Sequence, residues 1–121
     1  MSLHPQLAAT LAAERAASLA AAPRLTQDAL TLTLANGTEL TVRYAAEDAY
    51  SLRWRCADGA ELGIDTAPLH AGLASAPNHL HRADGTVVAD PLTRIDDTPE
   101  NNLLRLVDAL MRDPLLSGRA A

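Results

Sequence analysis

The sequence predicts an α+β fold, in which an antiparallel β-meander of five to six strands is covered on one face by an N-terminal and a C-terminal helix. Two observations carry this prediction. Apolar residues recur at helical spacing near both ends of the chain, whereas they alternate with polar residues through its middle. The 121 residues suffice for one hydrophobic core but not for two, so we predict a single domain over 1–121.

The first predicted element is an Ala-rich helix over residues 1–22. Leu3, Leu7 and Leu11 recur every four residues, and Leu19 follows eight positions later. The alanines between them have the highest helix propensity of any residue. The helix is expected to end before the next proline, because a proline inside a helix removes a hydrogen bond and clashes with the preceding turn.

Residues 29–89 are predicted to form the antiparallel sheet. From Leu30 onward, apolar residues alternate with polar ones, as they do in a half-buried strand. Three turns share a pattern that ends in glycine: Ala35-Asn36-Gly37, Ala57-Asp58-Gly59 and Ala83-Asp84-Gly85. Glycine takes the left-handed position of a three-residue hairpin loop without a Cβ clash. This closure predicts the apolar cross-strand pairs Leu32–Leu40, Trp54–Leu62, Leu52–Ile64 and Leu80–Val88. Between the first two hairpins, a five-residue connection over 45–49 predicts the pair Val42–Leu52.

The opposite face of this sheet is expected to be charged. The same register gives two polar rows across the strands: Glu39, Arg55 and Glu61 in one, and Arg43, Ser51 and Asp65 in the other. The arginines Arg43, Arg53 and Arg55 are candidates for binding phosphate. Because Glu39 and Glu61 flank Arg55, the sequence favours a solvated face whose ion pairs contribute little to stability.

The C-terminal helix is predicted over residues 98–113. Thr98 provides an N-cap, and Pro99 occupies the first helical position. Apolar residues then follow at helical spacing up to an Asp-Pro pair, which ends the helix. Residues 66–78 are expected to form a loop, and residues 117–121 a loose tail.

The composition excludes several classes of protein. All ten basic residues are arginines, and the net charge is −5. Because of this negative charge, the chain lacks the basic surface that binds nucleic acid without sequence preference. Any RNA or DNA contact has to be local. The single cysteine, Cys56, cannot form an internal disulfide, and its spacing predicts burial beside Trp54. No run of about 20 apolar residues occurs, so we expect a cytoplasmic protein that does not associate with a membrane.

The candidate site is a group of histidines. His70, His79 and His81 lie within twelve residues of one another, and Asp65 precedes them. In a strand, a His-x-His pair points both imidazoles the same way, which suits a divalent metal or a shared phosphate. The alternative is that these histidines are exposed polar residues with no common role. His4 is expected to lie on the surface of a fraying terminus.

Two segments resemble the TumE-like family of small bacterial and archaeal proteins. Ile64-Asp65-Thr66-Ala67-Pro68-Leu69-His70 is similar to the family's aromatic-Asp-Asn-Ala-Pro-His-His segment, and Ala76-Pro77-Asn78-His79-Leu80-His81 to its Pro-His-His-x-His segment. The matching positions are Asp65, Ala67, Pro68, His70, Pro77, His79 and His81. The departures from the family pattern are Ile64, Thr66, Leu69 and Asn78. The order of elements over residues 30–116 is also similar.

The resemblance implies a toxin-like component of a bacterial toxin–antitoxin pair, with an antitoxin protein as its partner and RNA as the substrate of a nuclease activity. It implies that His79 and His81 act as the general acid/base pair, and that Arg82 steadies the phosphate. Asp65 would then orient His70. Such a ribonuclease needs neither a metal nor another cofactor.

Two other functions are open from the sequence. One is a non-catalytic protein-interaction module, in which the Ala-rich helix or a sheet edge binds a partner or forms a homodimer. The other is a metal-binding small domain, which requires Asp65 and at least two histidines within about 2.0–2.2 Å of one ion. The interaction module predicts scattered histidines, whereas the nuclease and the metal-binding domain predict histidines that converge.

Overall fold

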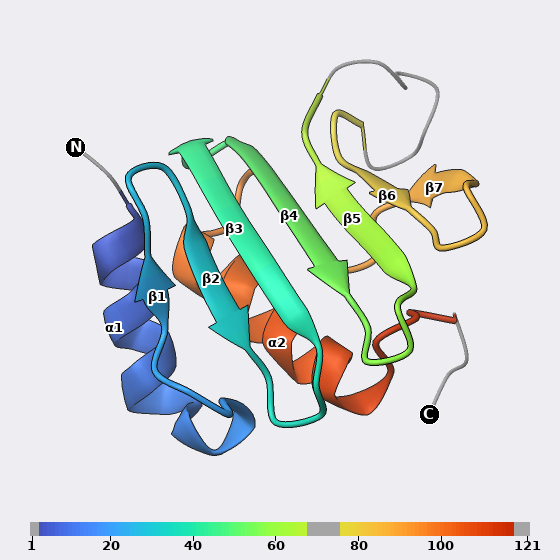
Figure 1. Ribbon diagram of the computed structural model, residues 1–121. Helices are drawn as coiled ribbons and strands as arrows, with labels where there is room; N and C mark the ends of the chain where they lie inside the picture. Colours follow the sequence, from blue (N-terminus) through green and yellow to red (C-terminus); the bar gives the residue numbers. More distant parts are fainter. Residues whose placement is uncertain (1–2, 68–75, 118–121) are drawn as a thin grey trace.

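The computed structural model describes residues 3–67 and 76–117, which form one antiparallel sheet and two α-helices. The strands lie in the sheet in the same order as in the chain, from β1 to β7, and both helices lie on one side of the sheet (Figure 1). The predicted α+β meander is confirmed. In chain order the elements are α1 (His4–Glu14), a 3₁₀ turn (Ala16–Ser18), β1 (Arg24–Leu25), β2 (Leu30–Thr33), β3 (Glu39–Ala46), β4 (Ala49–Arg55), β5 (Glu61–Asp65), β6 (His79–His81), β7 (Val87–Ala89) and α2 (Pro99–Arg112).

Within the described residues the sheet has seven strands, rather than the five to six predicted. The additional strand is β1, which pairs with the start of β2 through Arg24–Thr31 and Leu25–Leu30. Two residues at a sheet edge are too few to show an alternating pattern, and the sequence therefore did not predict this strand.

The predicted hairpin registers are confirmed, although the connection between β3 and β4 is shorter than the predicted 45–49, because Ala46 pairs with Ala49 after a register shift. All five apolar cross-strand pairs occur as expected: Leu32–Leu40, Val42–Leu52, Trp54–Leu62, Leu52–Ile64 and Leu80–Val88. The turn glycines Gly37, Gly59 and Gly85 have φ angles of +88°, +94° and +87°. In each turn the residue before the glycine accepts a hydrogen bond, through its side-chain oxygen, from the backbone N–H two residues further on. These local bonds fix the loop length, which in turn fixes the register.

Replacing a turn glycine with alanine tests this geometry. A Cβ atom at Gly37 would lie 3.1 Å from the Cβ of Ala57, whereas a Cβ at Gly85 would meet nothing within 4 Å. Either substitution puts an L-residue in the left-handed region, at a cost of about 1–2 kcal/mol. We expect Gly37→Ala to lower the free energy of unfolding, measured by urea denaturation, by more than Gly85→Ala. Equal losses would contradict a steric contribution from Ala57.

The N-terminal helix is shorter than the predicted range of 1–22. It ends at Glu14, and the chain then turns back along the edge of β2. Ala20 N–H donates to the carbonyl of Thr33, and Leu19 bridges Leu34. Backbone pairing with the sheet therefore replaces helix in a segment whose alanines favour helix. Neither helix of the described ranges is long and apolar enough to cross a membrane.

Both helices pack against the apolar face of the sheet. Their buried apolar residues include Leu7 and Leu11 from α1 and Leu103, Leu106, Val107 and Leu110 from α2. Thr98 caps α2 by accepting a hydrogen bond from Asn101 N–H at 3.0 Å, as predicted. Trp54 Nε1 donates to the carbonyl of Pro114 at 2.8 Å, which fixes the chain after α2 against β4. Most of the predicted tail, residues 118–121, lies outside the described residues.

The single cysteine is buried in the core, as predicted. Cys56 has 6% of its surface exposed, and its Sγ lies 3.7 Å from the carbonyl oxygen of Pro114. Burial raises the pKa of its thiol, which disfavours the reactive thiolate. We therefore assign Cys56 a packing role.

Candidate functional site

Asp65, His79 and His81 lie together on the outer face of the sheet, which is the face opposite the helices. Asp65 at the end of β5 lies opposite His79 on β6, and His81 lies opposite Gly63. Leu80, between the two histidines, is buried in the core because successive side chains in a strand point to opposite faces. The structure thus brings together three of the predicted site residues, which we call the His–Asp cluster.

The carboxylate of Asp65 bridges the two imidazoles. Its Oδ1 lies 2.7 Å from His79 Nε2, and its Oδ2 lies 3.1 Å from His81 Nε2. Oδ1 also accepts a hydrogen bond from Ala67 N–H at 3.1 Å, which orients the carboxylate. One ligand atom from each of the three side chains can be chosen so that all lie within 4.8 Å of one another. This convergence is what binding of a single ion requires.

The hydrogen bonds of His79 indicate that a positively charged species lies between its Nε2 atom and the carboxylate of Asp65. The His79 side chain is 1% exposed, and its Nδ1 lies 3.1 Å from the carbonyl oxygen of Pro77. Because a carbonyl only accepts, Nδ1 carries a hydrogen. Nε2 then faces a carboxylate oxygen, so a proton or a metal cation has to lie between them. Metal-binding histidines use this arrangement, in which one ring nitrogen donates to a carbonyl and the other binds the ion.

The cluster is accessible from the His81 side. The side chain of His81 is 43% exposed and that of Asp65 is 26% exposed. The two histidine rings meet edge to face, with centroids 4.7 Å apart. A ligand therefore reaches His81 and Asp65 from solvent, whereas His79 supports them from within the protein.

Of the other two predicted site residues, the structure describes only Arg82. His70 belongs to residues 68–75 and lies outside the described residues. Arg82 lines a separate surface hollow with Leu115 and Ser117, which follow α2. Adjacent residues along an extended chain face opposite sides, and this alternation directs Arg82 away from the outer face that carries the cluster.

A buried polar network that the sequence did not reveal lies directly before His79. The side-chain amide nitrogen of Asn78 lies 2.7 Å from the Tyr50 hydroxyl and 3.1 Å from a carboxylate oxygen of Asp90. It also lies 3.1 Å from the carbonyl oxygen of Thr93. Burial raises the pKa of the Tyr50 phenol, so the hydroxyl stays neutral. The network holds the backbone that leads into β6 and so fixes the position of His79.

The Asp90 turn is the part of this network that carries a sequence signal. Asp90 Oδ1 accepts hydrogen bonds from the backbone N–H groups of Leu92 and Thr93, at 2.8 and 3.0 Å. Aspartate followed by proline is typical of such a turn. The partners Asn78 and Tyr50 come from other segments of the chain, and no local pattern identifies them.

The expectation that His4 lies on a fraying terminus is wrong. His4 is buried, and its Nε2 accepts a hydrogen bond from Tyr44 N–H at 3.0 Å. The pairing between β2 and β3 ends at Leu30 and Val42, so Tyr44 extends beyond β2 and its N–H needs another acceptor. His4 therefore has a structural role that fastens α1 to the sheet.

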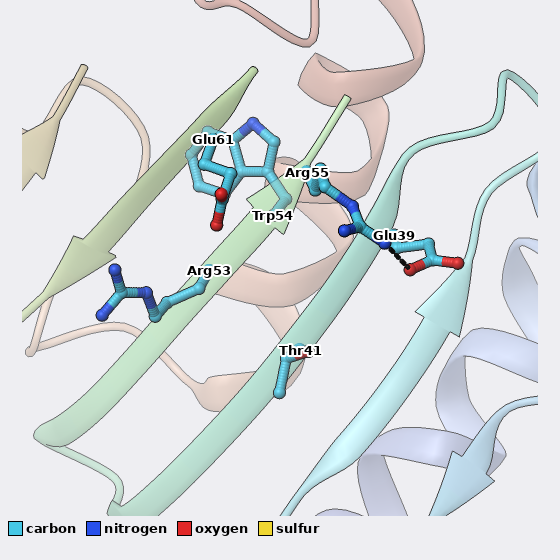
Figure 2. A pocket seen from close by; sticks show the side chains of 6 residues that line it. All are labelled: Glu39, Thr41, Arg53, Trp54, Arg55 and Glu61. Carbon is cyan, nitrogen blue, oxygen red and sulfur yellow. Dashed lines mark hydrogen bonds and ion pairs between the residues drawn. The ribbon is translucent and has the colours of Figure 1, made fainter. Parts of the chain in front are cut away.

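A shallow hollow lies on the outer face, over β3 and β4 (Figure 2). It is lined by Glu39, Thr41, Arg53, Trp54, Arg55 and Glu61. Arg55 Nη2 lies 3.2 Å from Glu39 Oε2, as the predicted charged row requires. Arg53 extends in another direction, from β4 toward β5. Arg55 is therefore paired with a carboxylate, whereas Arg53 is directed away from that pair.

A scan against protein-family models, a search of curated proteins and a search of solved structures found no match to this chain. The resemblance to the TumE-like family stays a prediction from the sequence. The fold and the geometry of the His–Asp cluster are the basis for a functional proposal.

Proposed function

We propose that Asp65, His79 and His81 bind one divalent transition-metal ion, and that the chain uses this site to cleave RNA as a toxin-like protein. The observation that carries the proposal is the convergence of the three ligand atoms within 4.8 Å. Two imidazole nitrogens and one carboxylate oxygen form a donor set that suits Zn²⁺.

The distances within the cluster fit such an ion. Zinc binds nitrogen and oxygen ligands at about 2.0–2.2 Å, so tetrahedral ligand atoms lie roughly 3.3 Å apart. The carboxylate oxygens of Asp65 lie 2.7 and 3.1 Å from the two histidine nitrogens. Small rotations of the carboxylate and of the exposed His81 ring bring the atoms to the required spacing.

The number and exposure of these residues suit catalysis. Catalytic zinc sites have three protein ligands and one position for water or substrate. When bound, the ion supplies an acidified water and polarises a phosphoryl oxygen. His81 and Asp65 are the exposed ligands, so an RNA phosphate approaches from their side.

The burial of His79 favours a metal-dependent site over the metal-free histidine pair that the resemblance implies. A general acid and a general base must each reach the proton that they transfer. His79 is almost completely buried, and both imidazoles contact the carboxylate of Asp65. Holding an ion requires no direct contact between His79 and the substrate.

The toxin-like part of the proposal rests on the resemblance to the TumE-like family, whose matching residues include Asp65, His79 and His81. On this proposal the protein acts on RNA in the cytoplasm, and a separate antitoxin protein neutralises it. Induced expression in a bacterial host is expected to arrest growth.

Zinc content and RNA cleavage by the purified protein test the proposal. We expect one Zn²⁺ per chain, measured by elemental mass spectrometry after zinc supplementation and gel filtration. We also expect cleavage of single-stranded RNA that EDTA abolishes and added Zn²⁺ restores. Cleavage that persists in EDTA would support the metal-free histidine pair instead. A chain that neither binds zinc nor cleaves RNA would contradict the proposal and favour a non-catalytic interaction module.

A further inference from the structure

We propose that Arg53 binds a phosphate group of the RNA substrate beside the His–Asp cluster. This inference rests on the proposed function and adds the residue that recognises the substrate. Three observations support it. They are the position of Arg53 in the sheet, the presence of Gly63 opposite it on the neighbouring strand, and the absence of a carboxylate partner for its guanidinium among the described residues.

The strand register places Arg53 and His81 in one row on the outer face. Arg53 on β4 lies opposite Gly63 on β5, and Gly63 lies opposite His81 on β6. Residues directly opposite one another share a face of the sheet. Adjacent strands are about 4.8 Å apart, so the backbones of Arg53 and His81 are roughly 10 Å apart. Both side chains can therefore contact one phosphodiester group held between them.

Gly63 makes room for the Arg53 side chain. A Cβ atom built at Gly63 would lie 3.5 Å from Cγ of Arg53, so the aliphatic part of Arg53 packs against this glycine. The guanidinium extends from β4 toward β5 and away from Arg55 and Glu39 (Figure 2). This direction leads toward the strand pair that carries the cluster.

The guanidinium of Arg53 is available for a ligand. Arg53 is exposed, and within the ranges that the structure describes it makes no side-chain hydrogen bond or ion pair. Arg55, two positions along the same strand, is instead paired with Glu39 at 3.2 Å. An unpaired guanidinium binds phosphate through two parallel N–H groups. A local cation of this kind is needed here, because the net charge of −5 disfavours a general attraction of RNA.

Binding of RNA by arginine variants tests the inference. The affinity for a short, fluorescently labelled oligouridine is measured by anisotropy in EDTA, which removes any metal, and gel electrophoresis checks that the RNA stays intact. We expect Arg53→Gln to weaken binding about 10- to 100-fold, because a hydrogen-bonded charged contact is lost. Arg55→Gln is the matched control on the same strand and face, and we expect it to change the affinity little.

A second variant tests the role of the glycine. Gly63→Val leaves Arg53 in place but puts a side chain where the aliphatic part of Arg53 packs. We expect this variant to lose RNA affinity to a similar extent as Arg53→Gln. A Cβ at Gly63 comes no closer than 3.4 Å to its nearest neighbour, the Leu52 carbonyl oxygen, and β-branched residues suit strands, so the variant should fold. Circular dichroism checks its folding.

Zinc content, measured separately, distinguishes the failure of this inference from the failure of the proposed function. Unchanged RNA affinity in Arg53→Gln, or equal losses in Arg53→Gln and Arg55→Gln, would overturn the phosphate site while leaving zinc binding intact. Wild-type protein that binds zinc but no RNA would also overturn it. If the wild type binds no zinc and only Arg53→Gln loses RNA affinity, the result would support the phosphate site. It would also contradict the metal-binding part of the proposed function.

Discussion

Replacing Asp65 with asparagine is expected to lower the affinity for Zn²⁺ by at least about 100-fold, since loss of even an outer-shell partner of a metal ligand typically costs about 10–100-fold. Asparagine keeps the size of the side chain and an oxygen that can accept from Ala67 N–H, so the fold is retained. Isothermal titration calorimetry measures the affinity. Glu61→Gln is the matched control, because Glu61 is an exposed carboxylate on the same strand and face. We expect this variant to bind zinc as tightly as the wild type.

Thermal unfolding provides a second readout of the same variants. Zinc at 100 times its dissociation constant stabilises the folded state by about 2.7 kcal/mol, which raises Tm by roughly 10 °C for a domain of this size. The wild type and Glu61→Gln should show this shift, and Asp65→Asn should not. A zinc-induced shift that survives in Asp65→Asn would contradict the assignment of Asp65 as a ligand.

Replacing Asn78 with leucine is expected to lower the free energy of unfolding by about 2–4 kcal/mol, because each buried polar group that loses its partner costs about 1–3 kcal/mol. The substitution removes the amide that contacts Tyr50 and Asp90, while it keeps the number and branching of the side-chain heavy atoms. Urea denaturation measures the loss. Asn101→Leu makes the same replacement at an exposed position, where we expect a change within about 0.5 kcal/mol.

The comparison of the two asparagine variants isolates the contribution of the buried network to the free energy of unfolding. Losses of equal size in Asn78→Leu and Asn101→Leu would contradict a structural role for the network. Because Asn78 directly precedes His79, we also expect Asn78→Leu to weaken zinc binding. Asn101→Leu should leave zinc binding unchanged.

The sheet could be predicted in detail because its determinants are local in the sequence. Three of the hairpins have a glycine turn, and turn length together with an alternating pattern sets their register. The length of α1 could not be predicted in the same way. Alanine propensity favours helix beyond Glu14, but the backbone of that segment pairs with β2, and this tertiary contact outweighs the propensity.

The candidate site was predictable only where strand pairing brings its residues together. Asp65, His79 and His81 meet because β5 and β6 are neighbours, and the His-x-His spacing signals the shared face. Arg82 is adjacent to His81 in sequence but lies elsewhere, whereas Arg53 is distant in sequence and lies in the same row. Proximity along the chain therefore did not indicate which residues share the row of the cluster, whereas the sheet register did.

His4 and Asn78 show why buried polar residues were hard to predict. Each satisfies a group on a distant segment: His4 accepts from the backbone of Tyr44, and Asn78 contacts Tyr50. The need for these partners arises from where strands begin and end in space. Such requirements leave no periodic pattern in the sequence.

The order of the strands also bears on how the protein behaves at high concentration. In a simple meander the first and last strands form the two edges of the sheet, and among the residues that the structure describes these are β1 and β7, with only two and three residues. An open edge exposes unpaired N–H and C=O groups that another chain can extend into a larger sheet. The long strands β3 and β4 are in the interior of the sheet, where neighbouring strands cover them. The short edges thus limit strand-by-strand aggregation of the folded protein.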